Sequence, residues 1–127
     1  MTIPIVTVSE ANVRGAWFAR SRRARAQRLA VAVALARYER PAFPVRVTLT
    51  RIASRRLDSD NLAGALKSVR DGCAAWLDVD DGPDGPVSWS YAQEVTRDTR
   101  RELVRTKTAI FMKAVPECAV RLTFGPP

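Results

Sequence analysis

Residues 45–52 read Val-Arg-Val-Thr-Leu-Thr-Arg-Ile, an alternation of apolar and polar side chains that predicts a β-strand. Because side chains alternate across a strand, Val45, Val47 and Leu49 share one face, which is the face expected to meet a hydrophobic core. No other segment of the chain gives so clear a strand pattern.

The segment that follows predicts a helix and then a second strand. Asp58 or Ser59 can cap the helix, because short polar side chains accept hydrogen bonds from the first helical N–H groups. The turn-rich residues 80–86 end this region, and residues 87–95 alternate again as a strand. The apolar residues of the expected helix recur at helical spacing: Leu62, Ala65, Leu66, Val69 and Trp76.

The amino-terminal part predicts a short strand at residues 3–8 and a long helix at residues 12–37, which Pro41 ends. Residues 29–36 of this helix are apolar nearly all round. They indicate either a subunit interface, most simply in a two-fold dimer, or an alanine-rich helix that tolerates exposure. Five arginines spread around the whole helix rather than forming one stripe: Arg20, Arg22, Arg23, Arg25 and Arg28.

The carboxyl-terminal part is less regular. Residues 97–107 are polar and predict no defined element, whereas residues 108–115 and 118–124 predict a closing pair of strands. The expected fold is therefore α+β, a mixed β-sheet with two main helices in the order β-α-β-α-β-β. It forms one domain over residues 1–127, without repeats or an interdomain linker.

Composition excludes several classes of function. The chain has no histidine, which removes imidazole acid-base catalysis and most transition-metal ligand sets. Its two cysteines, Cys73 and Cys118, are too few and too isolated for a disulfide framework or a zinc site. No apolar run is long enough to span a membrane, and the first residues lack the pattern of a secretory signal. We expect a cytoplasmic protein with no membrane partner and no organic cofactor.

Charge favours a polyanionic partner. Lysine and arginine outnumber the acids 21 to 13, for a net charge of +8, which favours a nucleic acid. Many soluble proteins are basic for no such reason, so charge alone leaves this open. The acids are concentrated, because seven of the 13 lie between Asp58 and Asp84.

The acids suggest a metal site. Asp58 and Asp60 are two residues apart, so in extended backbone their side chains point the same way. Asp80 or Asp81 can add a third carboxylate, and such a set suits Mg²⁺ or Mn²⁺ bound to substrate phosphate. Lys67 can reach the same area to orient water or offset phosphate charge. The structural alternative is a helix cap at Asp58 and a plain turn at residues 80–82.

A longer pattern adds to this interpretation. The sequence resembles the RusA family of Holliday-junction resolvases, in particular phage and prophage members, over about residues 3–95. The amino-terminal Ser-Glu-Ala-Asn-Val-Arg at residues 9–14, with Trp17 and the arginine-rich helix after it, is similar to the family's entry into its first helix. The central features of the pattern, in order, are Asp58-Ser59-Asp60-Asn61-Leu62, Lys67, Asp71, Asp80-Asp81 and Trp89-Ser90-Tyr91-Ala92-Gln93.

This resemblance implies a homodimeric, Mg²⁺-dependent endonuclease that nicks four-way DNA junctions symmetrically. Asp58 and Asp60 match the family's first two metal-binding aspartates, and Asp81, in preference to Asp80, matches the third. The family's lysine falls at Gly64 here, so Lys67, one turn further along, would substitute for it.

The expected DNA contacts are arginines of the first helix and of the segment just before Asp58, and residues 97–115 do not map onto the family. Two alternatives remain: a non-catalytic branched-DNA-binding protein whose acidic cluster is structural, and a nuclease of the same chemistry directed at RNA or replication forks. The arginines assigned to DNA are Arg14, Arg20, Arg22, Arg23, Arg25, Arg55 and Arg56.

Overall fold

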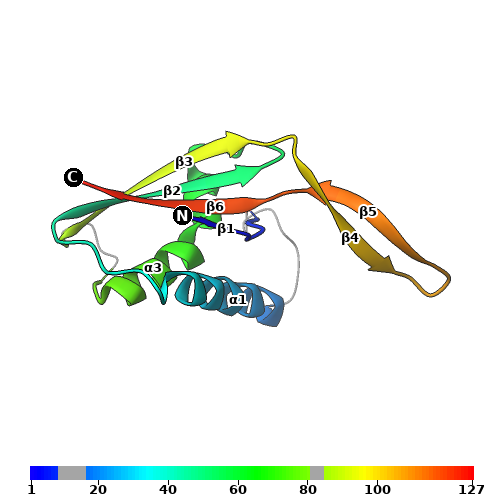
Figure 1. Ribbon diagram of the computed structural model, residues 1–127, viewed down its shortest axis with the longest axis horizontal. Coiled ribbons are helices and arrows are strands. Elements are labelled where there is room, and N and C mark those ends of the chain that lie inside the picture. Colours follow the sequence, from blue (N-terminus) through cyan, green and yellow to red (C-terminus); the bar gives the residue numbers. More distant parts are fainter. Residues whose placement is uncertain (9–16, 81–84) are drawn as a thin grey trace.

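The structure, a computed structural model, describes residues 1–8, 17–80 and 85–127. Its described part is an α+β fold in which α1 and α3 cover one face of a four-stranded sheet, while a two-stranded arm extends from one end (Figure 1). The elements, in chain order, are β1 (Thr2–Ile3), α1 (Trp17–Leu35), β2 (Val45–Ala53), α2 (Ser59–Ala65), α3 (Lys67–Leu77), β3 (Val87–Val95), β4 (Thr99–Arg105), β5 (Ile110–Pro116) and β6 (Ala119–Gly125).

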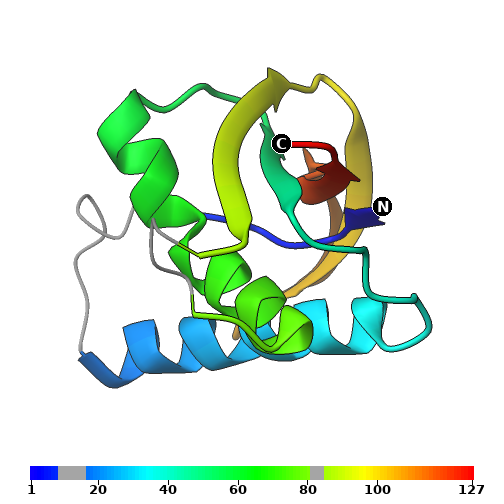
Figure 2. The same cartoon turned by 90° about the vertical axis from the view of Figure 1, so that its left-hand side faces the viewer.

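The sheet is mixed, with strand order β1-β6-β2-β3. β2 and β3 run parallel, which the helical crossover through α2 and α3 makes possible, whereas β6 is antiparallel to both β2 and β1. The strands predicted at residues 45–52 and 87–95 are confirmed as β2 and β3. Figure 2 looks along the sheet and shows α2 beside the edge strand β3, with α1 and α3 beneath.

The strands predicted at residues 108–115 and 118–124 are confirmed as β5 and β6, but they do not pair with each other as expected. β5 pairs with β4 and forms the arm, while β6 returns to the main sheet. Residues 97–107, predicted to hold no element, contain β4. The reason is that β4 has no buried side chain, so its sequence lacks the apolar alternation that marks a half-buried strand, and cross-strand pairing alone defines it.

The core lies between the sheet and the helices. Val45, Val47 and Leu49 are buried, as their alternation predicts. Burying each such side chain contributes about 1.5–3 kcal/mol of hydrophobic free energy. The partners of these residues include Val31 and Leu35 of α1, Val69, Cys73 and Leu77 of α3, and Val120 and Leu122 of β6.

The helix predicted across residues 58–76 is in fact two helices. Leu66 has φ −98° and ψ 0°, outside the helical region, and separates α2 from α3. The break lets Leu66 remain fully buried while the chain changes direction. The observed order is therefore β-α-β-α-α-β-β-β-β rather than β-α-β-α-β-β.

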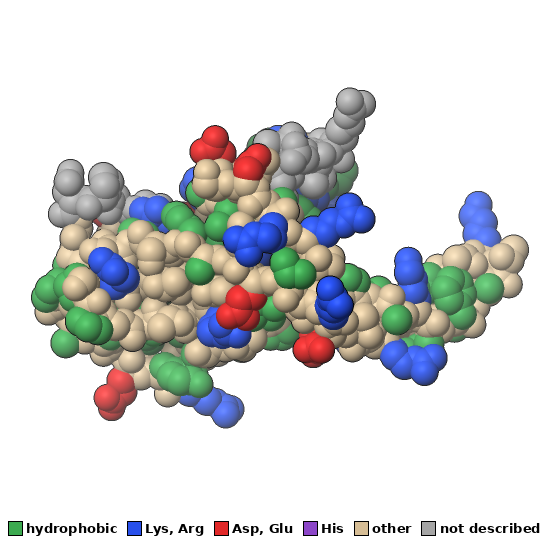
Figure 3. Space-filling view, turned by 90° about the horizontal axis from the view of Figure 1, so that it is seen from above, with side chains coloured by type: hydrophobic (Ala, Val, Ile, Leu, Met, Phe, Trp, Pro, Cys, Tyr) green, Lys and Arg blue, Asp and Glu red, His purple; other side chains and the backbone are tan. Residues whose placement is uncertain are grey.

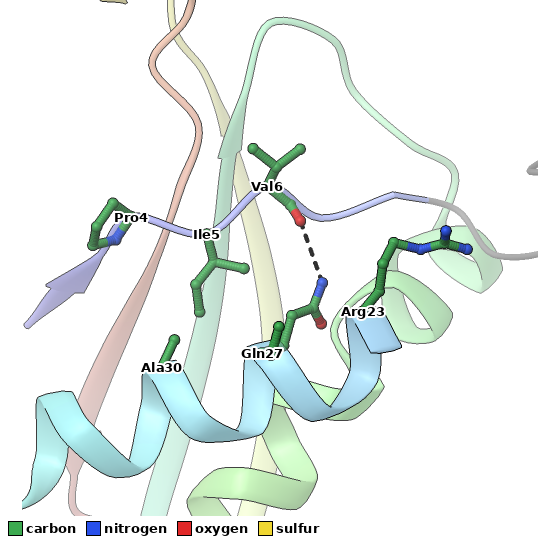
Figure 4. Close-up of a pocket in the computed structure, with 7 residues that line it drawn as sticks. Pro4, Ile5, Val6, Arg23, Gln27 and Ala30 are labelled. Atoms are coloured by element: carbon green, nitrogen blue, oxygen red, sulfur yellow. Dashed lines mark hydrogen bonds between the residues drawn. The ribbon is translucent and has the colours of Figure 1, made fainter. Parts of the chain in front are cut away.

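The amino-terminal strand is shorter than predicted. β1 pairs with β6 only through Thr2 and Ile3, and the next residue, Pro4, has no N–H to continue a ladder. Ile5 and Thr7 are nevertheless buried, and the side chain of Gln27 donates to the Val6 carbonyl oxygen at 3.2 Å (Figure 4).

The long helix α1 is buried on one side only. Val31 and Leu35 are fully buried, whereas Leu29 and Val33 are 65% and 67% exposed. The described helix ends two residues before the predicted end, and the predicted beginning at residues 12–16 lies outside the described residues. Beside β1 the exposed side forms an apolar groove of about 480 Å³, lined by Ile3, Pro4, Ala26, Leu29, Ala30, Val33 and Ala34.

Candidate metal and nucleic-acid site

The Asp58–Asp60 pair lies at the end of the sheet where both parallel strands finish. Ala53, the last residue of β2, pairs with Val95, the last residue of β3. The chain then turns through an exposed loop into α2, which begins just after Asp58. Ligands of α/β proteins commonly bind at the carboxyl ends of parallel strands, so this is a favourable place for a site.

Asp58 is the N-cap of α2, as the sequence predicts. Its Oδ1 accepts a hydrogen bond from the Asn61 backbone N–H at 2.9 Å. Asp60 lies in the first turn, where a carboxylate is favoured by the positive end of the helix dipole. Both aspartates are exposed. The cap uses one oxygen of Asp58, so the pair can present its remaining oxygens to a cation.

Gln93 of β3 holds the residue immediately before this cap. Its Oε1 accepts from the Leu57 backbone N–H at 2.9 Å, and its Nε2 donates to the Leu57 carbonyl oxygen at 2.7 Å. The two bonds imitate strand pairing and fix both position and direction of the backbone that enters α2. The clamp of Gln93 on Leu57 is a role that the sequence alone does not indicate, because the two residues are 36 positions apart.

Arg51 of β2 holds the other end of the same loop. Its Nη1 donates to the Arg55 carbonyl oxygen at 2.7 Å, and its Nε donates to Thr7 Oγ1 at 3.0 Å. The side chain is buried, and burial lowers the pKa of this guanidinium from its ordinary value while the charge of Cys118 opposes the shift. Two sheet residues, Arg51 and Gln93, thus position the loop that delivers Asp58.

The third predicted ligand is not brought to this pair by the described residues. β3 begins at Val87, which pairs with Val45 at the start of β2, so residues 85 and 86 lead into β3 at the opposite end of the sheet. Asp80 lies three residues after Leu77, the last residue of α3. Within residues 1–8, 17–80 and 85–127, no three His, Cys, Asp or Glu side chains gather as a metal site. Asp81, the preferred third ligand, lies outside the described residues.

Lys67 is the first residue of α3 and not part of the helix that carries Asp60. Its Nζ lies 3.1 Å from Asp71 Oδ2, an ion pair at i, i+4 helical spacing. In this arrangement the lysine charge is directed to Asp71.

The predicted DNA-contacting arginines occupy two surfaces. Arg55 and Arg56 are exposed on the loop directly before Asp58. On α1, Arg20, Arg22 and Arg25 are exposed, whereas Arg23 is half-buried and borders a cavity of about 220 Å³ between α1 and residues 4–6 (Figure 4). Arg14 lies outside the described residues. Figure 3 shows lysine and arginine side chains scattered over the upper face and along the arm.

A further basic group was not anticipated. The Arg70 guanidinium lies 4.9 Å from the centroid of the Trp89 ring, and its Nη1 donates to the Tyr91 hydroxyl at 2.7 Å. The group lines a cavity of about 290 Å³ with Val87 and Ser88. Trp89 and Tyr91 share one face of β3, but only the packing of α3 on that face brings Arg70 to them, which is why sequence spacing gave no signal.

None of the described helices combines the length and the apolar character that crossing a bilayer requires. No family model, curated protein or solved structure matches this chain.

Proposed function

We propose that this protein is a Mg²⁺-dependent, structure-selective endodeoxyribonuclease of the RusA type that resolves four-way DNA junctions by paired nicks. The observation that carries the proposal is the placement of Asp58 and Asp60. Both stand at the start of α2, next to the exposed Arg55 and Arg56, on a loop that Gln93 holds by two hydrogen bonds. The resemblance of this segment to the RusA pattern supplies the substrate class.

The donor set fits Mg²⁺ or Mn²⁺. These ions prefer hard oxygen ligands, keep several waters, and are commonly held by one or two carboxylates together with substrate phosphate. Asp58 and Asp60 would hold the ion together with substrate phosphate, while the third ligand expected at Asp81 lies outside the described residues. When bound, the ion supplies activation of water and charge stabilisation at the phosphodiester. Arg55 and Arg56 orient the DNA backbone, because guanidinium groups bind phosphate bidentately.

The active form in this proposal is a homodimer. The apolar groove beside α1 and the exposed Leu29 and Val33 support a second copy packing there. A two-fold axis would give two sites that match the symmetry of a four-way junction, and hence paired nicks. Gel filtration with light scattering tests this part, and a monomer at micromolar concentration contradicts it.

The catalytic proposal is tested by Asp60→Asn. This change removes a metal ligand and a negative charge that faces phosphate, so nicking of a labelled four-way junction in Mg²⁺ is expected to disappear while binding in EDTA is retained or tightened. Asp71→Asn is the matched control, because Asp71 is a half-buried aspartate paired with Lys67 on the next helix. Undiminished nicking by Asp60→Asn would overturn the assignment.

A second candidate is a branched-DNA-binding protein without catalysis. It is favoured by the hydrogen bond from the Asn61 backbone N–H to Asp58, which gives this carboxylate a structural use, and by the absence of a three-ligand cluster among the described residues. Under this alternative, millimolar Mg²⁺ leaves the melting temperature unchanged, whereas a cation bound to the folded state raises it. The Mg²⁺-induced change in the melting temperature of the native chain is compared with that of Asp60→Asn, which lacks the metal ligand and is expected not to respond.

A further inference from the structure

The two-stranded arm formed by β4 and β5 has no packing partner in the described part of the chain. The strands pair with each other over seven residue pairs, from Thr99–Pro116 to Arg105–Ile110. No other helix or strand packs extensively on them, and Figure 1 shows the arm projecting from the end of the sheet. A two-stranded ribbon by itself is only marginally stable in water, so we expect an arm of this kind to pack on another surface.

The tip of the arm is nevertheless well defined. The Thr106 backbone N–H donates to the Ala109 carbonyl oxygen at 2.9 Å, and Thr106 Oγ1 accepts from the Ala109 backbone N–H at 3.0 Å. These bonds close a compact turn that presents Lys107 at its end. At about 3.3 Å per residue, seven-residue strands give a reach of roughly 23 Å, about two-thirds of a turn of B-DNA.

The two faces of the arm differ in charge. Within residues 99–116, five basic residues accompany a single acid, Glu102. Glu102 lies directly opposite Lys113 and 3.8 Å from Arg100, so the acid is on their face. The other face, called here the Arg101 face, carries no acid. From the register and the alternation of side chains it consists of Arg101, Leu103, Arg105, Ile110, Met112 and Ala114.

The Arg101 face combines two arginines with an exposed apolar row. Leu103, Ile110 and Met112 are 52%, 65% and 47% exposed, and they lie between and beside Arg101 and Arg105. Ribbon arms of such composition suit duplex DNA, because guanidinium groups bind the phosphates while apolar side chains contact sugars or wedge into a base step. A two-stranded ribbon also fits the width of the major groove.

From this charge and shape we infer that the β4–β5 arm is a DNA-binding ribbon that grips a duplex branch through its Arg101 face. Charge complementarity selects DNA over a second copy of the chain, since a chain of net charge +8 would meet the basic arm with like charge. The inference rests on the proposed function for the identity of the polyanion, but it needs no metal chemistry.

The first test measures binding of a fluorescent four-way junction in EDTA over a series of salt concentrations. The double variant Arg101→Ala/Arg105→Ala is expected to bind at least about tenfold more weakly and to lower the salt slope by about two, one for each lost phosphate contact. The control Arg37→Ala/Arg40→Ala removes the same charge from exposed positions between α1 and β2, and is expected to change affinity less than about twofold. Equal losses in both would show a net-charge effect and overturn the inference.

A second test addresses the apolar row. Ile110→Ser/Met112→Ser on the Arg101 face is expected to weaken junction binding, whereas Phe111→Ser on the opposite face leaves it unchanged. If the first variant alters the molar mass in light scattering but not the DNA affinity, the row is a protein interface and the inference is overturned.

Binding and cleavage separate this inference from the proposed function. Arm-dependent binding in EDTA without any nicking in Mg²⁺ contradicts the nuclease proposal and supports the arm. If nicking depends on the metal but junction affinity is unchanged in the arm variants, the nuclease proposal is supported and the inference about the arm is contradicted.

Discussion

Gln93 shows how one side chain connects the sheet to the candidate site. Gln93 is half-buried on β3, and its amide hydrogen-bonds with both the N–H and the C=O of Leu57. Without Gln93, these two partly buried backbone groups would lose their hydrogen-bond partners. An amide can do this because it carries one donor group and one acceptor on the same planar unit. Few other side chains offer both at that spacing.

Replacing Gln93 with alanine is therefore expected to lower the free energy of unfolding by about 1–3 kcal/mol, since two polar backbone groups lose their partners. Junction nicking is expected to fall with it, because Asp58 follows the released residue. Urea denaturation and nicking assays measure the two effects. Ser88→Ala on the same strand, at an exposed position, serves as the control and should alter neither.

Cys73 gives a prediction that depends on pH. Burial among apolar side chains raises the pKa of its thiol from 9.0 to about 12. In the unfolded chain the thiol ionises above pH 9, while in the folded chain it stays neutral, so the stability it contributes is present below pH 9 and falls as the pH rises toward 12.

The expected loss is about 1.4 kcal/mol per pH unit within that window. The loss is measured as the difference in unfolding free energy between the native chain and Cys73→Ala at several pH values. Taking this difference cancels the contributions of the other titrating groups, which are the same in both proteins. A difference that stays constant from pH 8 to pH 10 would contradict the buried neutral thiol.

At the scale of elements, the contact between α1 and α3 depends on a glycine. A Cβ at Gly72 would lie 3.2 Å from Val31 Cβ and 3.3 Å from Arg28 Cα. The second contact is to backbone, which cannot move aside without shifting the whole of α1. Gly72 thus sets how closely the two helices approach.

Gly72→Ala is expected to destabilise the protein by about 1–3 kcal/mol through overpacking, which exceeds the gain of about 1 kcal/mol in helix propensity. Gly64→Ala in α2 is the matched control, because a Cβ there meets nothing within 4 Å. That control is expected to stabilise by about 0.5–1 kcal/mol. Thermal melts of both variants measure these changes in stability. If both substitutions raise or both lower the melting temperature, the packing explanation is contradicted.

The sequence predicts those elements whose side chains face the core. β2 and β3 follow from alternation, because one face of each is buried, and the Asp58 cap follows from the polar side chain that precedes an apolar helical pattern. The break at Leu66 does not, since Leu66 continues the helical spacing and only the packing of α3 on α1 and the sheet demands the turn. β4 is equally difficult to predict from the sequence, because a ribbon that is exposed on both faces has no alternation of apolar and polar residues.

The candidate site is predictable to a similar extent. Asp58 and Asp60 are only two residues apart in the sequence, so their shared location was expected, and the Lys67–Asp71 pair follows from helical spacing. The Gln93 clamp joins residues 36 apart and depends on the parallel pairing of β2 with β3, and Arg51 also reaches Thr7, 44 residues away. Sequence reasoning has no local signal for contacts of that kind.

At the scale of the whole molecule, the body and the arm are separable. The Glu117 backbone N–H donates to the Asp98 carbonyl oxygen at 2.9 Å, so the two ends of the arm are already bridged at its base. Replacing residues 99–116 by an Asn-Gly turn is expected to leave the body folded, with the melting temperature changed by less than about 5 °C.

The same deletion is expected to weaken junction binding in EDTA and to leave the circular dichroism of the helices unchanged. Calorimetry and anisotropy measure the two effects on one preparation. A drop in the melting temperature of about 15 °C or more would show that the arm contributes to the core after all.

The bridge between Asp98 and Glu117 has a consequence for how such a chain evolves. An element joined to its body at a single closed base can lengthen, shorten or change its composition between generations with little effect on folding of the rest. Mutations in the clamped loop before Asp58 have no such freedom, because Arg51 and Gln93 bind its backbone. Diversification among descendants should therefore accumulate in the arm, while the segment around Asp58 varies slowly.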